Sequence, residues 1–218
     1  MTGRPLVQLP RLAGQSESEI FFEALARNDA APTGPAAIAP IDDGSEELLA
    51  RFVGELAAAF GSRGELLAQR GRILPGARDA VRALAALPGV VQSVLTGTIR
   101  PNAVEKLRAF GLDGYFDFEI GGYGSEVYPK GAQLMRSKSR AAEKYGVPSG
   151  EVSTVYIGDS TRDVAAALVG GARSVAVATG RSTEGELRAA GAGMVLPDLT
   201  DTSAVLGAIR LLVMPSAG

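Results

Sequence analysis

The sequence contains no cysteine and no histidine. Without cysteine, the chain has no disulfides, no thiolate metal sites and no thiol nucleophile. Without histidine, a Ser-His-Asp triad and a histidine-ligated zinc are excluded as well. Any catalysis must therefore use carboxylates, hydroxyls, lysine, arginine, backbone amides or a metal ion held by oxygen ligands.

The sequence also lacks long apolar runs and a strong charge of either sign. No apolar run approaches the roughly 18 residues that a membrane-spanning helix needs, and the first residues do not show the pattern of a signal peptide. The net charge of −2 disfavours nucleic acid and anionic membranes as partners. We therefore expect a cytoplasmic protein with no nucleic-acid or membrane partner.

The 218 residues, 46% of them hydrophobic, are enough to bury a sizeable core. Before residue 74 the apolar spacing predicts two helices, at Glu17–Arg27 and at 46–60. We expect residues 1–73 to form a small helical region and residues 74–218 to form an α/β core.

Strand and helix patterns alternate after residue 74. This alternation predicts a parallel sheet with helices on both of its faces. The expected strands are 90–95, 116–120, 152–157, 174–177 and 194–196, and the expected helices are 76–87, 101–110, 131–145, 161–169, 184–190 and 203–212.

Two aspartates follow the strand predicted at 152–157. Asp159 comes directly after Gly158, and Asp163 lies four residues later, inside a predicted helix. Open α/β sheets bind ligands beyond the carboxyl ends of their strands, and oxygen ligands of this kind suit Mg²⁺ bound together with a phosphate. Alternatively, Ser160 and Asp163 form only a helix-capping box; the motif alone leaves both interpretations open.

Two further groups occur at or near strand ends. Thr96, Gly97 and Thr98 follow the strand predicted at 90–95, where a hydroxyl and backbone N–H groups can face a phosphate. Lys130 precedes the long predicted helix and can place a point charge on a phosphoryl oxygen. Taken alone, each also fits an ordinary turn or a solvated lysine. Their order along the chain, hydroxyl, lysine and paired aspartates, favours a single site.

In this order the residues resemble the motifs of the haloacid dehalogenase (HAD) superfamily of phosphohydrolases. Thr96 matches the second motif, Lys130 the third, and Asp159 with Asp163 the fourth. The segments 94–102 and 121–125 resemble the phosphoglycolate phosphatase-like branch, and the helical region before residue 74 resembles its inserted cap. The resemblance implies a Rossmannoid parallel sheet and Mg²⁺-dependent hydrolysis of a small phosphorylated metabolite.

The resemblance also implies a role for each residue. Asp159 would be a Mg²⁺ ligand, and Asp163 would support the water shell of the metal or orient Lys130. Thr96 would hold the transferring phosphoryl group, with Gly97 and Thr98 lining the site. Lys130 and the metal would act by electrostatic stabilisation.

The first motif of the family, Asp-x-Asp, supplies the nucleophile and the general acid/base, and it is lacking here. No two aspartates in the sequence are separated by a single residue; the nearest patterns are Asp42-Asp43 and Asp117-Phe118-Glu119. Our hypothesis is that the chain starts at an internal methionine and lacks the first core strand. We then expect unpaired backbone edges at 90–95 and 152–157, and a marginal, rearranged or homo-oligomeric protein. The alternative function is a catalytically inactive HAD-like fragment or a non-catalytic binding module.

Overall fold

The computed structural model describes residues 7–10, 15–28, 43–126 and 129–213. Within these ranges the helices are α1 (Glu17–Arg27), α2 (Asp43–Gly61), α3 (Gly64–Arg70), α4 (Ala77–Ala85), α5 (Arg100–Arg108), α6 (Lys130–Tyr145), α7 (Thr161–Val169), α8 (Glu184–Ala189) and α9 (Thr202–Val213). The strands are β1 (Val155–Gly158), β2 (Arg173–Val177) and β3 (Met194–Leu196). None of these helices is both long and apolar enough to cross a membrane.

The three strands form one parallel sheet in the order β1-β2-β3. In the register of the sheet, Ile157 lies opposite Val175, and Val175 lies opposite Met194. α7 connects β1 to β2 and α8 connects β2 to β3. A helix between two strands returns the chain to the end of the sheet where the first strand began, so the next strand runs parallel to it. A short hairpin would instead join antiparallel neighbours.

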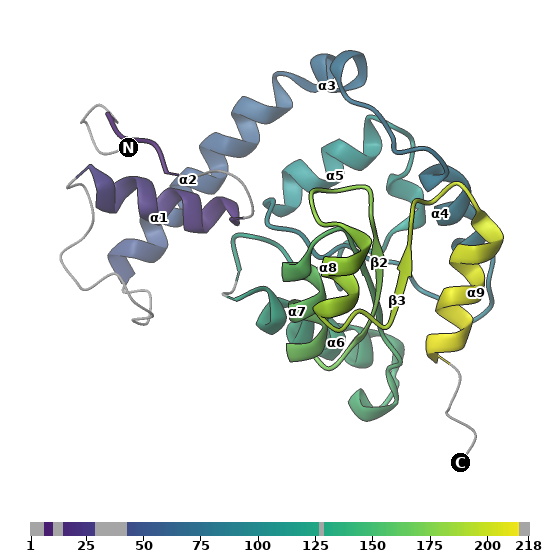
Figure 1. Ribbon diagram of the computed structural model, residues 1–218. Helices are drawn as coiled ribbons and strands as arrows, with labels where there is room; N and C mark the ends of the chain where they lie inside the picture. The colour runs from purple at the N-terminus through teal and green to yellow at the C-terminus, as the bar shows by residue number, and fades with distance from the viewer. Residues whose placement is uncertain (1–6, 11–14, 29–42, 127–128, 214–218) are drawn as a thin grey trace.

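Helices cover both faces of the sheet (Figure 1). Successive side chains of a strand point to opposite faces. Val175 on β2 therefore packs in one cluster with residues of α4 and α9, while its neighbour Ala176 packs in another with Val164 of α7 and Leu187 of α8. The α/β fold class predicted from the sequence is confirmed.

Helices α1 and α2 pack on each other through a hydrophobic cluster of their own. Its buried members are Phe21, Leu25 and Leu49, and the rings of Phe21 and Phe52 stack with their centroids 4.4 Å apart. Figure 1 shows this helix pair beside the α/β part, in purple and blue. The division of the chain near residue 74 stays a prediction.

The strands predicted at 90–95 and 116–120 are wrong. The only bridge in this region of the described chain joins Leu95 to Gly122, which lies beyond the second segment. The N–H of Asp117 donates to the carbonyl of Gln92 (2.8 Å) and the N–H of Gly122 donates to that of Val94 (2.9 Å). Between these two hydrogen bonds the chain advances by two residues on one side, from Gln92 to Val94, and by five on the other, from Asp117 to Gly122. A regular ladder advances equally on both sides, so no continuous strand forms.

One edge of β1 pairs with β2, and in the described ranges no strand pairs with its other edge. The side chain of Ile157, on β1 itself, is 37% exposed. Exposed strand edges are templates for pairing with another chain. The homo-oligomer and the marginal stability expected from the sequence stay predictions.

Gly76 returns the chain into the α/β part at the start of α4. Its φ of +77° is left-handed, and a Cβ built on it would overlap the carbonyl oxygen of Leu199. The segment before α9 therefore packs directly against the backbone of residue 76.

We predict that Gly76→Ala lowers the free energy of unfolding by about 2–5 kcal/mol, the sum of two contributions. A left-handed alanine costs roughly 1–2 kcal/mol, and overpacking adds about 1–3 kcal/mol. Gly89→Ala is the matched control, because Gly89 shares the positive φ of +73° but has no atom within 4 Å of the added Cβ. Urea unfolding of both variants measures the difference, and equal losses would contradict the close packing at residue 76.

Candidate active site

The site begins at the carboxyl end of β1, where Ser160 caps α7. The hydroxyl oxygen of Ser160 accepts a hydrogen bond from the N–H of Asp163 (3.2 Å). The Asp163 carboxylate in turn accepts from the Ser160 hydroxyl (2.7 Å) and from the N–H of Asp159 (3.3 Å). Ser160 thus caps α7, but the predicted capping box is incomplete, because the Asp163 carboxylate accepts from the N–H of Asp159 and not from that of Ser160.

Asp163 forms an ion pair with Lys130, the first residue of α6. The Lys130 Nζ lies 2.6 Å from Asp163 Oδ1, and the side chains are 37% and 9% exposed, respectively. The Tyr156 hydroxyl donates to the same oxygen (2.9 Å), and the lysine Nζ lies 5.9 Å from the centroid of the tyrosine ring. A buried charge needs such partners, because desolvation alone would make it costly.

This network sets the protonation states of its members. Burial acts to raise the pKa of Asp163, but the hydrogen bonds from Lys130 and Ser160 outweigh it and hold that pKa below its usual value. Burial, reinforced by the charge of Asp163, raises the pKa of Tyr156 far above its usual value. Asp163 is therefore a carboxylate and Tyr156 a protonated donor at neutral pH.

Asp159 lies at the mouth of the turn between β1 and α7. A Cβ added to Gly180, in the loop after β2, would lie 2.5 Å from Oδ2 of Asp159. A Cβ added to Gly158 would overlap the side chain of Asp163. The two glycines thus make room for the two carboxylates.

The loop after residue 95 forms a second group of hydrogen bonds. The Thr96 hydroxyl oxygen accepts from the N–H of Thr98 (3.1 Å), and the N–H of Thr96 donates to the carbonyl of Gly122 (3.0 Å). Lys106 donates to the hydroxyl of Thr98 (3.1 Å). The N–H of Gly97 has no acceptor among the described residues.

The structure brings Lys130 and Asp163 together, next to Asp159. It records no contact between these residues and the group Thr96, Gly97 and Thr98, so the roles expected of these residues stay predictions. Tyr156 is a site residue that was not predicted from the sequence, where it lies within the strand predicted at 152–157. The signal was its place three residues before Asp159, at the end of the strand that carries the aspartates.

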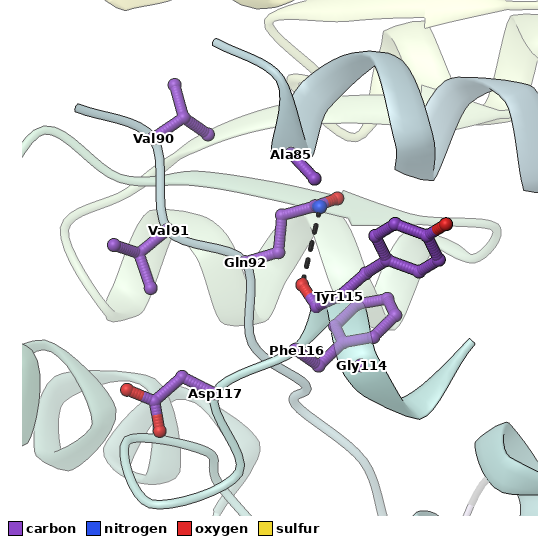
Figure 2. A pocket seen from close by; sticks show the side chains of 8 residues that line it. All are labelled: Ala85, Val90, Val91, Gln92, Gly114, Tyr115, Phe116 and Asp117. Carbon is purple, nitrogen blue, oxygen red and sulfur yellow. Dashed lines mark hydrogen bonds between the residues drawn. The ribbon is translucent and has the colours of Figure 1, made fainter. Parts of the chain in front are cut away.

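A shallow groove of about 330 Å³ lies elsewhere (Figure 2). It lies at the amino end of the segment whose carboxyl end is Thr96. Since ligands of open α/β sheets bind at carboxyl ends, we assign this groove no part in the site. Its lining residues are Ala85, Val90, Val91, Gln92, Gly114, Tyr115, Phe116 and Asp117.

The fold agrees with comparisons to known proteins. Residues 18–171 match the family model of the haloacid dehalogenase-like hydrolases. This match covers well over half of the chain, which therefore belongs to that family. A search of characterised proteins found no match.

Two of the matched solved structures support the same fold. A hydrolase from Pseudomonas syringae is 22% identical over 90% of this chain and 80% of its own, with a TM-score of 0.56. A predicted phosphoglycolate phosphatase from Haemophilus somnus 129pt is 19% identical over 91% and 84% of the two chains, with a TM-score of 0.53. The match to a predicted phosphatase from Clostridium acetobutylicum covers 61% of this chain but only 59% of that one, at 24% identity and a TM-score of 0.49.

We predict that Lys130→Met lowers the free energy of unfolding by about 1–3 kcal/mol at neutral pH, because a buried carboxylate loses its cation. Since the pKa of Asp163 is depressed in the folded state, the pair stabilises the protein above the unfolded pKa of aspartate. This stabilisation is lost as the pH falls through the folded pKa. Unfolding measured from pH 7 to pH 2 should therefore show the wild type and the variant converging in acid.

Lys138→Met is the matched control for this prediction. Lys138 also lies on α6, but its Nζ donates to the carbonyl of Gly171 (2.7 Å) and does not contact Asp163. Carboxyl-carbon NMR should find a raised Asp163 pKa in Lys130→Met only. An unchanged Asp163 pKa in that variant would contradict the ion pair.

Proposed function

We propose that the chain carries the phosphate- and metal-binding part of a Mg²⁺-dependent phosphatase that acts on a small organic phosphate. One observation carries the proposal: a lysine held by a buried carboxylate lies beside a second aspartate at the carboxyl end of β1, in a haloacid dehalogenase-like hydrolase. The likeness to a predicted phosphoglycolate phosphatase supports a substrate of that class.

Lys130 supplies the positive charge of this site. Asp163 holds the ammonium from one side, while the lysine side chain keeps 37% exposure and is within reach of a ligand. An ammonium of this kind acts as a point charge on a phosphoryl oxygen. Because its position is fixed before the ligand arrives, it stabilises developing charge without a reorganisation cost.

The loop at residue 96 supplies neutral donors. The Thr96 hydroxyl and the N–H of Gly97 donate to no acceptor among the described residues. We propose that they hold the remaining phosphoryl oxygens, with Thr98 lining the same loop.

Asp159 is the carboxylate that fits Mg²⁺. Both oxygens of Asp163 already accept hydrogen bonds, from Lys130 and Tyr156 on one and from Ser160 on the other, so we assign Asp163 to orienting Lys130. No group of three metal-binding side chains occurs in the described ranges. Mg²⁺ commonly takes one or two carboxylates together with waters and substrate phosphates. The residues therefore fit a weak metal site that the phosphate of the substrate completes, where the ion would neutralise phosphoryl charge.

A second candidate function is non-catalytic binding of phosphate and Mg²⁺. It is favoured by the lack of any Asp-x-Asp pair in the sequence, because the nucleophile of the family stands in that motif. Turnover of p-nitrophenyl phosphate with and without Mg²⁺ separates the two functions. The cytoplasmic location, the homo-oligomeric state and the lack of nucleic-acid or membrane partners stay predictions.

We predict that phosphate and Mg²⁺ each strengthen the binding of the other, as linkage requires for a shared site. Asp159→Asn should abolish this coupling and any Mg²⁺-dependent turnover, because it removes the carboxylate that fits the metal. Calorimetric titration of Mg²⁺ with and without inorganic phosphate measures the effect.

Asp198→Asn is the matched control, since Asp198 also follows a strand of the sheet, but among the described residues its carboxylate accepts hydrogen bonds only from Thr200 in its own loop. The proposal fails if Asp159→Asn leaves the coupling intact, or if neither ligand binds the wild-type chain.

A further inference from the structure

The start of α1 docks on the loop at residues 96–99, far away in the sequence. The N–H of Glu17 donates to the carbonyl of Gly97 (2.7 Å). The Glu17 carboxylate accepts from the N–H of Ile99 (2.6 Å). Glu17 therefore binds the loop backbone on both sides of Thr98.

The same junction includes a third segment, around Gly124. The Ser18 hydroxyl donates to the carbonyl of Gly124, and the N–H of Gly124 donates to the carbonyl of Thr98 (3.1 Å). Ser16 and Ser18 are 8% and 2% exposed. Polar groups buried to this extent are costly unless they are paired, so these contacts specify how the three segments meet.

Two glycines show how closely the segments approach. A Cβ on Gly97 would lie 3.0 Å from the Cα of Ser16, and a Cβ on Gly124 would overlap the carbonyl of Gly97. The loop therefore has little room to take another conformation while α1 is docked.

Three of the four amide groups in the loop at residues 96–99 already donate hydrogen bonds. The N–H groups of Thr96, Thr98 and Ile99 donate to Gly122, to the Thr96 hydroxyl and to Glu17, in that order. Among the described residues, the N–H of Gly97 alone in this run is left without an acceptor. The contacts that fix the loop thus leave open the one amide that the proposed function assigns to phosphate.

We propose that Glu17 is a positioning residue: it holds the loop at residues 96–99 in the conformation that binds phosphate, without touching the phosphate itself. The ligand in this inference rests on the proposed function, whereas the clamp rests on the contacts of Glu17 alone. A hydrogen bond from an amide to a carboxylate is stronger than one to a neutral acceptor. The carboxylate also lies at the amino end of α5, where the helix dipole favours negative charge.

Glu19 offers the matched control. It lies in the same first turn of α1, but its carboxylate accepts from the N–H of Ser16 (2.5 Å), in the capping box of its own helix. Glu17→Ala and Glu19→Ala both remove one acidic side chain from the start of α1. Only the first removes the acceptor from the loop.

The experiment compares Glu17→Ala, Glu17→Gln and Glu19→Ala by amide NMR, hydrogen exchange and titration with inorganic phosphate. In Glu17→Ala, we expect the Ile99 amide proton to move upfield and to exchange roughly tenfold faster, and phosphate to bind roughly tenfold more weakly, as for the loss of a charged hydrogen bond. Glu17→Gln keeps an acceptor and should restore most of both readouts. Glu19→Ala should lower the melting temperature and leave both unchanged.

An unchanged Ile99 amide in Glu17→Ala would overturn the inference. Equal effects of Glu17→Ala and Glu19→Ala would overturn it too, because they would show that Glu17 acts only through the stability of α1. If the wild-type chain does not bind phosphate, the proposed function fails, while the Ile99 amide still decides whether Glu17 holds the loop.

Discussion

The structure around the site depends on the buried charge of Asp163. A carboxylate in this position is stable only with a cation and hydrogen-bond donors beside it, and Lys130, Tyr156 and Ser160 supply them. These partners come from α6, β1 and the start of α7. The charge thereby fixes how two helices meet the end of a strand.

The backbone of α6 and α7 allows this approach. A Cβ on Gly131, next to Lys130, would lie 2.6 Å from Cγ1 of Val169, and one on Gly170 would lie 2.6 Å from Cδ2 of Leu134. Small residues at both contacts let the helices pack closely enough for the lysine to reach the aspartate. Packing and electrostatics therefore support the same arrangement, which is the kind of consistency that specifies a single structure.

The sequence predicted the helices well because their apolar spacing reports burial directly. Glu17–Arg27 and 161–169 match α1 and α7 exactly, whereas α3, which buries no residue, left no pattern to find. The segments 90–95 and 116–120 have strand-like composition, but strand formation depends on neighbours, and their pairing is interrupted by the unequal spacing of its hydrogen bonds. The contact of Glu17 with Ile99 spans 82 residues, and no local pattern encodes it.

The two halves of the candidate site are supported by different parts of the chain. Asp163 fixes Lys130 from within the sheet and its helices, while α1 fixes the loop at Thr96 from outside them. Both oxygens of Asp163 already accept hydrogen bonds, so the proposed metal ion would be bound by Asp159 and by the ligand. Under the proposed function, the groups assigned to phosphate are held in place by the protein itself, whereas the metal site would be completed only when the ligand binds.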